Sequence, residues 1–252
     1  MAKTIFNCLV IFTISIQLFS CQKTADEYYN SAITLSKEHK VESSINAIAL
    51  FDNTIEVNPN FAMAYLDRGR TQFEIQNIRN VVGKTINEGA KNLYNFDHKF
   101  KGIEQDSLFK KSILDYDKAL ELDSTLIKDV TVAKGHVFLV SKNFTSAVCL
   151  FLNAIEIDSS DKSLVYPIVT CMLSLADTTG AKLFLDSIVS YNNQDSEIYY
   201  LRAINRLVDF KDLMGGCEDL MKAEELYDSS KIYNHNNLKE DIEKLKKINC
   251  SI

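Results

Sequence analysis

Apolar and polar positions alternate along most of the chain with the period of helices that bury one face. In the stretch "INAIALFDNTIEV", Ala47, Phe51 and Thr54 are three and four residues apart. Such steps place side chains on one stripe of an α-helix. Further on, "SAVCLFLNAIEI" places alanines and an aromatic residue with the same steps. Each segment therefore predicts an amphipathic helix that is buried along one stripe.

The same positions recur at fixed offsets, which indicates internal repeats. Ala47 and Pro59 are twelve residues apart, and so are Ala147 and Ser159. Phe51 and Phe151 fall at the same point within these two spans. Acidic residues followed by Pro or Ser close the units, as in "IEVNPN", "LELDST" and "IEIDSS". A single unit of this kind cannot bury its apolar stripe alone, so we expect neighbouring units to stack.

Small residues precede these helices and predict where each partner helix packs. Gly69, Gly135 and Ala203 each lie in a helical segment that comes before an aromatic or leucine residue on the next helix. A small side chain lets two helices approach closely. The pattern predicts antiparallel helical hairpins, and the chain's low content of two prolines and eight glycines favours mostly α structure.

This pattern resembles the tetratricopeptide repeat, most clearly over residues 43–75 and 109–160 and less clearly over 196–226. The resemblance implies an all-α, right-handed solenoid of antiparallel helix pairs over residues 26–252, with about five hairpins and a C-terminal helix. It also implies a concave groove, lined by the first helix of each pair, that binds a partner protein or peptide. The groove positions most suited to contact a partner are Asp67, Arg70, Phe73, His136 and Tyr200.

One interval departs from the repeat. Gly69 and Ser112 are 43 residues apart, whereas the corresponding interval from Gly135 to Ala147 is 12. We therefore expect an insertion in the second repeat, at about residues 78–107. Insertions of this length often carry partner contacts. An elongated hairpin with no special role explains the interval equally well.

The N-terminal segment has the character of an export signal. Residues 5–19 are mostly apolar and too short for a membrane-spanning helix, which needs about 20 such residues. The stretch from Leu18 to Cys21 resembles the bacterial lipobox, which implies a signal peptide over residues 1–20 and a lipid on Cys21. A short linker, 21–25, would follow. The resemblance implies a location in the bacterial cell envelope, anchored to the outer membrane on its periplasmic or surface face.

Four further cysteines follow the first repeat. Cys149 and Cys171 lie in apolar surroundings, where buried free thiols and a disulfide are equally consistent with the sequence. Cys217 and Cys250 flank the final helices, and a disulfide between them would hold the C-terminal end together. Four cysteines permit three pairings, and we favour this one.

The chain shows no pattern of a catalytic or metal site. It lacks paired histidine ligands, a phosphate-binding glycine loop and a nucleophile motif. Its formal net charge of −6 disfavours nucleic acid as a partner. Asp115 and Asp117 are interpreted as charges on an exposed helix face. We therefore expect a binding protein that is not an enzyme and has no cofactor.

Two functions fit these observations. The first is a lipid-anchored protein–protein interaction module. The alternative is an accessory lipoprotein that captures a nutrient or glycan, with Tyr94, Phe96 and Phe100 of the insertion stacking on the ligand. The absence of tryptophan counts against the second function, because sugar-binding platforms most often use that ring.

Overall fold

The computed structural model describes residues 23–87, 107–191, 194–228, 235 and 237–250. Within these ranges the chain consists of helices and the turns that connect them. It divides into two units, 1–126 and 127–252, and each is described by itself. The predicted signal peptide, Cys21 and most of the predicted insertion lie outside the described residues.

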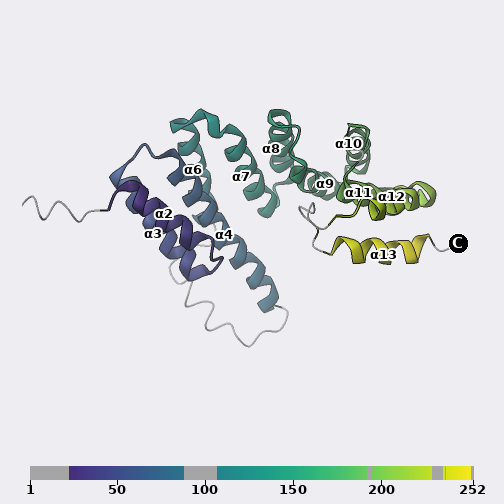
Figure 1. Ribbon diagram of the computed structural model, residues 1–252, viewed down its shortest axis with the longest axis horizontal. Coiled ribbons are helices and arrows are strands. Elements are labelled where there is room, and N and C mark those ends of the chain that lie inside the picture. Colours follow the sequence, from purple (N-terminus) through teal and green to yellow (C-terminus); the bar gives the residue numbers. More distant parts are fainter. Residues whose placement is uncertain (1–22, 88–106, 192–193, 229–234, 236, 251–252) are drawn as a thin grey trace, which may run out of the picture. The chain divides into compact units, whose positions relative to one another are not determined.

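The first unit contains two antiparallel helix pairs, α2 with α3 and α4 with α6 (Figure 1). Its elements are α2 (Ala25–Ser36), α3 (Val41–Val57), α4 (Ala62–Asn87), α6 (Ser107–Leu122) and the short 3-10 helix η1 (Ser124–Leu126). The helix α4 continues through Asn87, so the first part of the predicted insertion is an extension of this helix. Residues 88–106 of the insertion lie outside the described residues.

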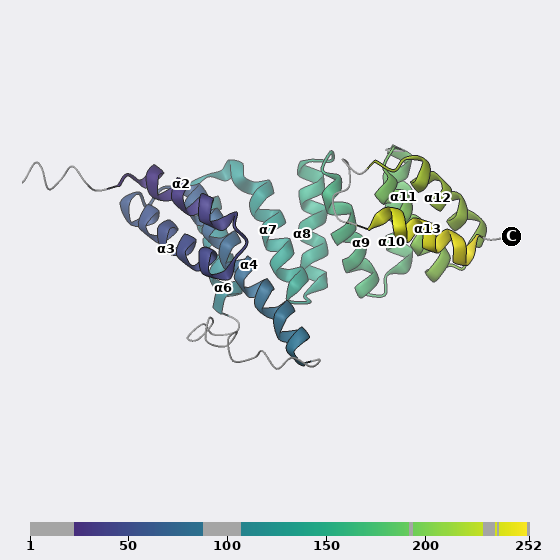
Figure 2. The same cartoon turned by 60° about the horizontal axis from the view of Figure 1, so that its bottom comes forward.

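The second unit contains three helix pairs and a final helix (Figure 2). The pairs are α7 with α8, α9 with α10, and α11 with α12, and α13 packs against α12. The elements are α7 (Ile127–Val140), α8 (Phe144–Ile157), the 3-10 helix η2 (Lys162–Leu164), α9 (Val165–Ser174), α10 (Thr178–Tyr191), α11 (Ser196–Ile204), the π-helix η3 (Asn205–Asp209), α12 (Leu213–Glu225) and α13 (Leu238–Asn249).

Most turns inside the pairs share one backbone geometry. His39, Lys142, Ala176 and Lys211 have φ angles of 51°, 61°, 60° and 57°. Each of these residues lies two positions before the first residue of the second helix in its pair. The side chains of Asn143 and Asp212 then accept hydrogen bonds from the first turn of that helix. A single left-handed residue followed by a cap reverses the chain within a few residues.

The small residues lie at the helix contacts that the repeat pattern predicts. A Cβ added to Gly69 would lie 2.6 Å from a ring carbon of Tyr116, and one added to Gly135 would lie 2.6 Å from a ring carbon of Phe151. Both glycines therefore allow an aromatic ring to lie directly on the backbone of the first helix. In the last pair, Ala203 is fully buried in one core cluster with Leu220. The predicted all-α array of antiparallel helix pairs is confirmed.

Candidate partner-binding site

A buried ion pair fixes the register of α4 against α6. Arg68 donates from Nε and Nη2 to the two carboxylate oxygens of Asp115, at 2.8 and 2.6 Å. Its Nη1 donates to Asp52 of α3 at 2.6 Å. The interpretation of Asp115 as a solvated surface charge was wrong, because its side chain is 8% exposed and faces the arginine. One guanidinium thus joins three helices.

The second unit repeats this arrangement. Arg202 of α11 donates to both carboxylate oxygens of Asp219 in α12, at 2.9 and 2.7 Å, and to Asp186 of α10 at 3.2 Å. Arg202 directly precedes Ala203, just as Arg68 directly precedes Gly69. Arg206 adds a second guanidinium, 3.0 Å from Asp219. The arginine before the small residue is therefore a repeated structural feature, and it positions the first helix of each of these pairs.

The three predicted contact residues of α4 differ in how accessible they are. Asp67 is 14% exposed and accepts a hydrogen bond of 2.6 Å from the hydroxyl of Tyr29. Phe73 is half-buried, with its ring stacked on that of Phe109 at a centroid distance of 5.9 Å. Arg70 donates to Asp67 at 3.1 Å while its side chain stays 43% exposed. Among these three, the guanidinium of Arg70 is the group that is most open to a partner.

His136 lies inside its helix pair. Its ring packs edge-on against Phe151, with the centroids 5.0 Å apart. Burial lowers the pKa of His136, because a partly buried imidazole loses the hydration that favours its charged form. The side chain is therefore neutral near pH 7, and it packs against the aromatic ring that covers Gly135.

Tyr200 lies on α11 beneath the C-terminal segment. It is 6% exposed, and its ring lies 4.9 Å from that of His235, measured between centroids. Burial, followed by the charge of Asp241, raises the pKa of Tyr200 to about 12. The phenol therefore keeps its proton at physiological pH. Only the structure shows that His235 and residues of α13 pack on this side of α11.

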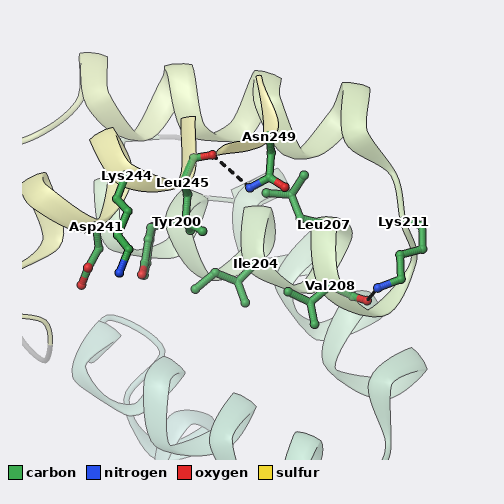
Figure 3. Close-up of a pocket in the computed structure, with 9 residues that line it drawn as sticks. All are labelled: Tyr200, Ile204, Leu207, Val208, Lys211, Asp241, Lys244, Leu245 and Asn249. Carbon is green, nitrogen blue, oxygen red and sulfur yellow. Dashed lines mark hydrogen bonds between the residues drawn. The ribbon is translucent and has the colours of Figure 1, made fainter. Parts of the chain in front are cut away.

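A pocket of about 450 Å³ opens beside Tyr200, between α11, η3 and α13 (Figure 3). Its middle is aliphatic, while charged and amide side chains lie around it. The lining residues are Tyr200, Ile204, Leu207, Val208, Lys211, Asp241, Lys244, Leu245 and Asn249. Pockets of this size and composition are typical of sites that bind small molecules or side chains. Tyr200 is the predicted contact residue that lines this pocket.

Helix α13 is held in place by a disulfide and by ion pairs. Cys217 of α12 and Cys250, at the end of α13, form a disulfide with their Cα atoms 5.7 Å apart. Lys246 of α13 pairs with Glu224 of α12, and His235 hydrogen-bonds Asp241 at 2.7 Å. These contacts fix the wall of the pocket that α13 forms. Cys149 and Cys171 are free thiols.

The described part of the chain has neither a metal-site cluster nor a membrane-spanning helix. No cluster of three or more His, Cys, Asp or Glu side chains there has the arrangement of a metal site. None of the helices described has the length and apolar character needed to cross a membrane.

Comparison with solved structures identifies the fold. No protein-family model matches the chain, and no curated protein matches it. The chain is similar to YrrB, described as a TPR protein with an unusual peptide-binding site, with a TM-score of 0.53, 18% identity, and coverage of 92% of this chain and 97% of that one. It is also similar to a tetratricopeptide repeat protein from Parabacteroides merdae, with a TM-score of 0.52, 15% identity, and coverage of 99% and 79%.

A third similar structure is residues 41 to the end of MamA from Desulfovibrio magneticus, with a TM-score of 0.57, 13% identity, and coverage of 84% of this chain and 100% of that one. At these identities the similarity defines the fold, which is that of tetratricopeptide repeat proteins. The fold agrees with the helix pairs and the small-to-large contacts described above.

Sequence reasoning missed the arginine pairs and the pocket. Signals for the arginine pairs exist, because Arg68 and Arg202 both precede the small residue while Asp115 and Asp219 both precede the large residue of the second helix. No comparable signal exists for the pocket. Its lining combines α11 and α13, which are separated in sequence by a whole helix.

Proposed function

We propose that this protein is a lipid-anchored interaction module that binds a partner protein or peptide through its tetratricopeptide-like array. The observation that carries this proposal is the array of antiparallel helix pairs itself. Repeats of this kind build extended surfaces from the first helix of each pair, and such surfaces suit extended or helical partners. The peptide-binding site named for YrrB belongs to that protein, and it supports the same kind of function here.

Arg70 and Tyr200 are the residues that we assign to partner contact in the two units. Arg70 is the most exposed of the three α4 positions, and a guanidinium suits a carboxylate on the partner. Tyr200 forms one wall of an open pocket, where an apolar side chain of the partner would be buried. Asp67, Phe73 and His136 already have partners within the fold, so they support the surface around these two contacts.

The anchor is a separate part of the proposal. The apolar segment before Cys21 and the polar sequence after it support removal of residues 1–20 and acylation of the cysteine. This would place the protein on the outer membrane, at its periplasmic or surface face. Mass spectrometry of the mature N-terminus in the native bacterium tests the anchor. We expect an acylated Cys21, and a Cys21→Ser variant should leave the membrane fraction while a Cys149→Ser control should stay in it.

Co-purification tests the interaction itself. The protein would be crosslinked in intact cells, solubilised and isolated, with Arg70→Glu and Tyr200→Ala compared against the wild type. We expect a stoichiometric partner that is reduced in both variants and retained by a Lys118→Glu control, which changes an exposed charge on α6. If no protein copurifies and the isolated chain binds a glycan array, the interaction proposal is wrong and the glycan-capture alternative replaces it.

A further inference from the structure

We propose that the pocket between α11, η3 and α13 binds an aliphatic carboxylate, which is an apolar chain or side chain that ends in a –COO⁻ group. A free fatty acid and the C-terminal leucine or isoleucine of a peptide both have this chemistry. The inference rests on the proposed function through Tyr200, which the two share. The pocket lies entirely within the second unit, on residues that the structure describes (Figure 3).

The middle of the pocket suits an aliphatic group. Ile204 of α11, Leu207 and Val208 of η3 and Leu245 of α13 contribute its aliphatic side chains (Figure 3). Val208 is 57% exposed, so a ligand would remove apolar surface from water at this position. Leu207 and Val208 belong to the π-helix η3, and π-helical turns are frequent at functional sites.

One end of the pocket carries two hydrogen-bond donors that suit a carboxylate. Tyr200 and Lys244 both line the pocket, and Figure 3 draws them, with Asp241, at this end of it. Among the residues described, neither group has a hydrogen bond or ion pair. The Tyr200 side chain is largely buried and lines the pocket, so a ligand in the pocket could accept a hydrogen bond from its hydroxyl. A carboxylate would accept from both donors, and charge-assisted bonds of this kind are strong.

The remaining charged groups at the pocket are already engaged. Asp241 lies at the same end, and its carboxylate is bonded to the Nε2 atom of His235 at 2.7 Å. At the opposite end, Lys211 donates to the backbone oxygen of Val208 at 2.7 Å. Since the phenol of Tyr200 keeps its proton up to a pKa of about 12, it is a donor throughout the physiological range. An anionic ligand therefore fits better than a cationic one.

Calorimetry with three amphiphiles of equal chain length tests the inference directly. Decanoate, decanol and decyltrimethylammonium would be titrated into the folded protein at neutral pH and low ionic strength. We expect decanoate to bind at least about tenfold more tightly than the other two, because only decanoate brings a negative charge and can form charge-assisted hydrogen bonds with Lys244. Equal binding of all three would overturn the proposed carboxylate recognition. Binding of decyltrimethylammonium alone would also overturn it, because the pocket would then prefer a cation.

Variants in the pocket sharpen the test. Lys244→Glu should weaken decanoate binding by about tenfold or more and Tyr200→Phe by about fivefold. Lys239→Glu is the matched control, because it makes the same charge change on α13 at an exposed residue outside the pocket. Circular dichroism would show that each variant is folded. If Lys244→Glu binds decanoate like the wild type, the proposal is wrong.

A second pair of ligands identifies the source of the carboxylate. A peptide that ends in a free leucine and the same peptide with a C-terminal amide would be compared with decanoate. Binding of the acid but not the amide indicates a polypeptide ligand, and binding of decanoate alone indicates a free fatty acid. Failure of every carboxylate to bind at millimolar concentration overturns the inference. It would leave the interaction proposal standing if the Arg70-dependent partner still copurifies.

Discussion

The helix pairs α4/α6 and α11/α12 solve the same packing problem with different residues. Both place an arginine before the small residue of the first helix and an aspartate before the large residue of the second. In α4/α6 the small and large residues are Gly69 and Tyr116, whereas in α11/α12 they are Ala203 and Leu220. The comparison shows that the repeat conserves the combined volume at the contact rather than the individual residues.

The two pairs also differ in how their charges balance. In the first pair one guanidinium, Arg68, serves two carboxylates, Asp52 and Asp115. In the second pair Arg202 and Arg206 serve Asp186 and Asp219. The first set therefore has one arginine for two aspartates, whereas the second set has two arginines for two aspartates.

The pKa values of two of these carboxylates, Asp115 and Asp186, shift in opposite directions. Burial raises the pKa of Asp115, and the nearby charge of Asp52 adds to this rise against the opposing effect of Arg68. Burial would also raise the pKa of Asp186, but Lys182 and the two arginines lower it overall. Asp115 is the more buried of the two, while Asp186 is more exposed and has three cations beside it, so the two shifts have opposite signs.

Removing the carboxylate that pairs with the arginines should have the largest effect on stability. We expect Asp219→Ala to lower the free energy of unfolding by about 3–5 kcal/mol, because it leaves two partly buried guanidinium groups with one carboxylate. Asp115→Ala should cost less, about 2–3 kcal/mol, since Arg68 keeps Asp52. Urea denaturation measures both values.

The matched control replaces both partners of the first ion pair by apolar residues. Arg68→Met combined with Asp115→Leu should cost clearly less than Asp115→Ala alone, because no charge is then left buried without a partner. Equal losses for Asp115→Ala and Asp219→Ala would show that the number of arginines does not matter.

The disulfide is the next largest difference between the pairs, because it ties α13 to α12 and has no counterpart in α4/α6. Its separation of 33 residues corresponds to a loss of about 3–4 kcal/mol when Cys217 and Cys250 are both replaced by serine. Denaturation of oxidised and reduced protein gives this value. Cys149→Ser is the control, and a reduced protein that is as stable as the oxidised one would contradict the expectation.

Gly69→Ala tests whether the combined volume of the small and large residues limits this contact. The new Cβ would lie 2.6 Å from Tyr116, so we expect a loss of about 1–2 kcal/mol after allowing for the better helix propensity of alanine. The substitution should be harmless or stabilising when Tyr116→Leu is already present, since this reproduces the Ala203 and Leu220 contact. A double-mutant cycle measures the coupling, and additive effects of the two substitutions would show that combined volume is not the limit.

Carboxyl titration by NMR measures the smallest difference. Asp115 should titrate above the ordinary aspartate pKa of about 3.9, and Asp186 should titrate below it. Because the pKa of Asp186 is lowered by folding, its contribution to stability is present above about pH 4 and is lost as the pH falls through its folded value. The contribution of Asp115 has the opposite sign and decreases as the pH rises through its folded pKa. Identical pKa values for Asp115 and Asp186 would contradict both expectations.

Much of the architecture could be predicted from local sequence. The three- and four-residue steps around Phe51 and Phe151, and the small residues Gly69, Gly135 and Ala203, predict helices that pack in pairs. These features could be read from the chain because each depends on residues that are close in sequence. The accessibility of individual side chains could not be read in this way. Asp115 was predicted to be exposed and is buried, since its environment depends on an arginine 47 residues away.

The sequence by itself determined that this chain forms helix pairs whose small and large residues meet, because helix periodicity and side-chain volume act over short distances along the chain. Only the tertiary structure decided that α13 packs beside Tyr200, how many arginines meet each pair of aspartates, and that a pocket lined by Tyr200 and Lys244 lies between α11 and α13. These features depend on which distant segments come together. That outcome is set by the packing of the whole unit and leaves no periodic signal in the sequence.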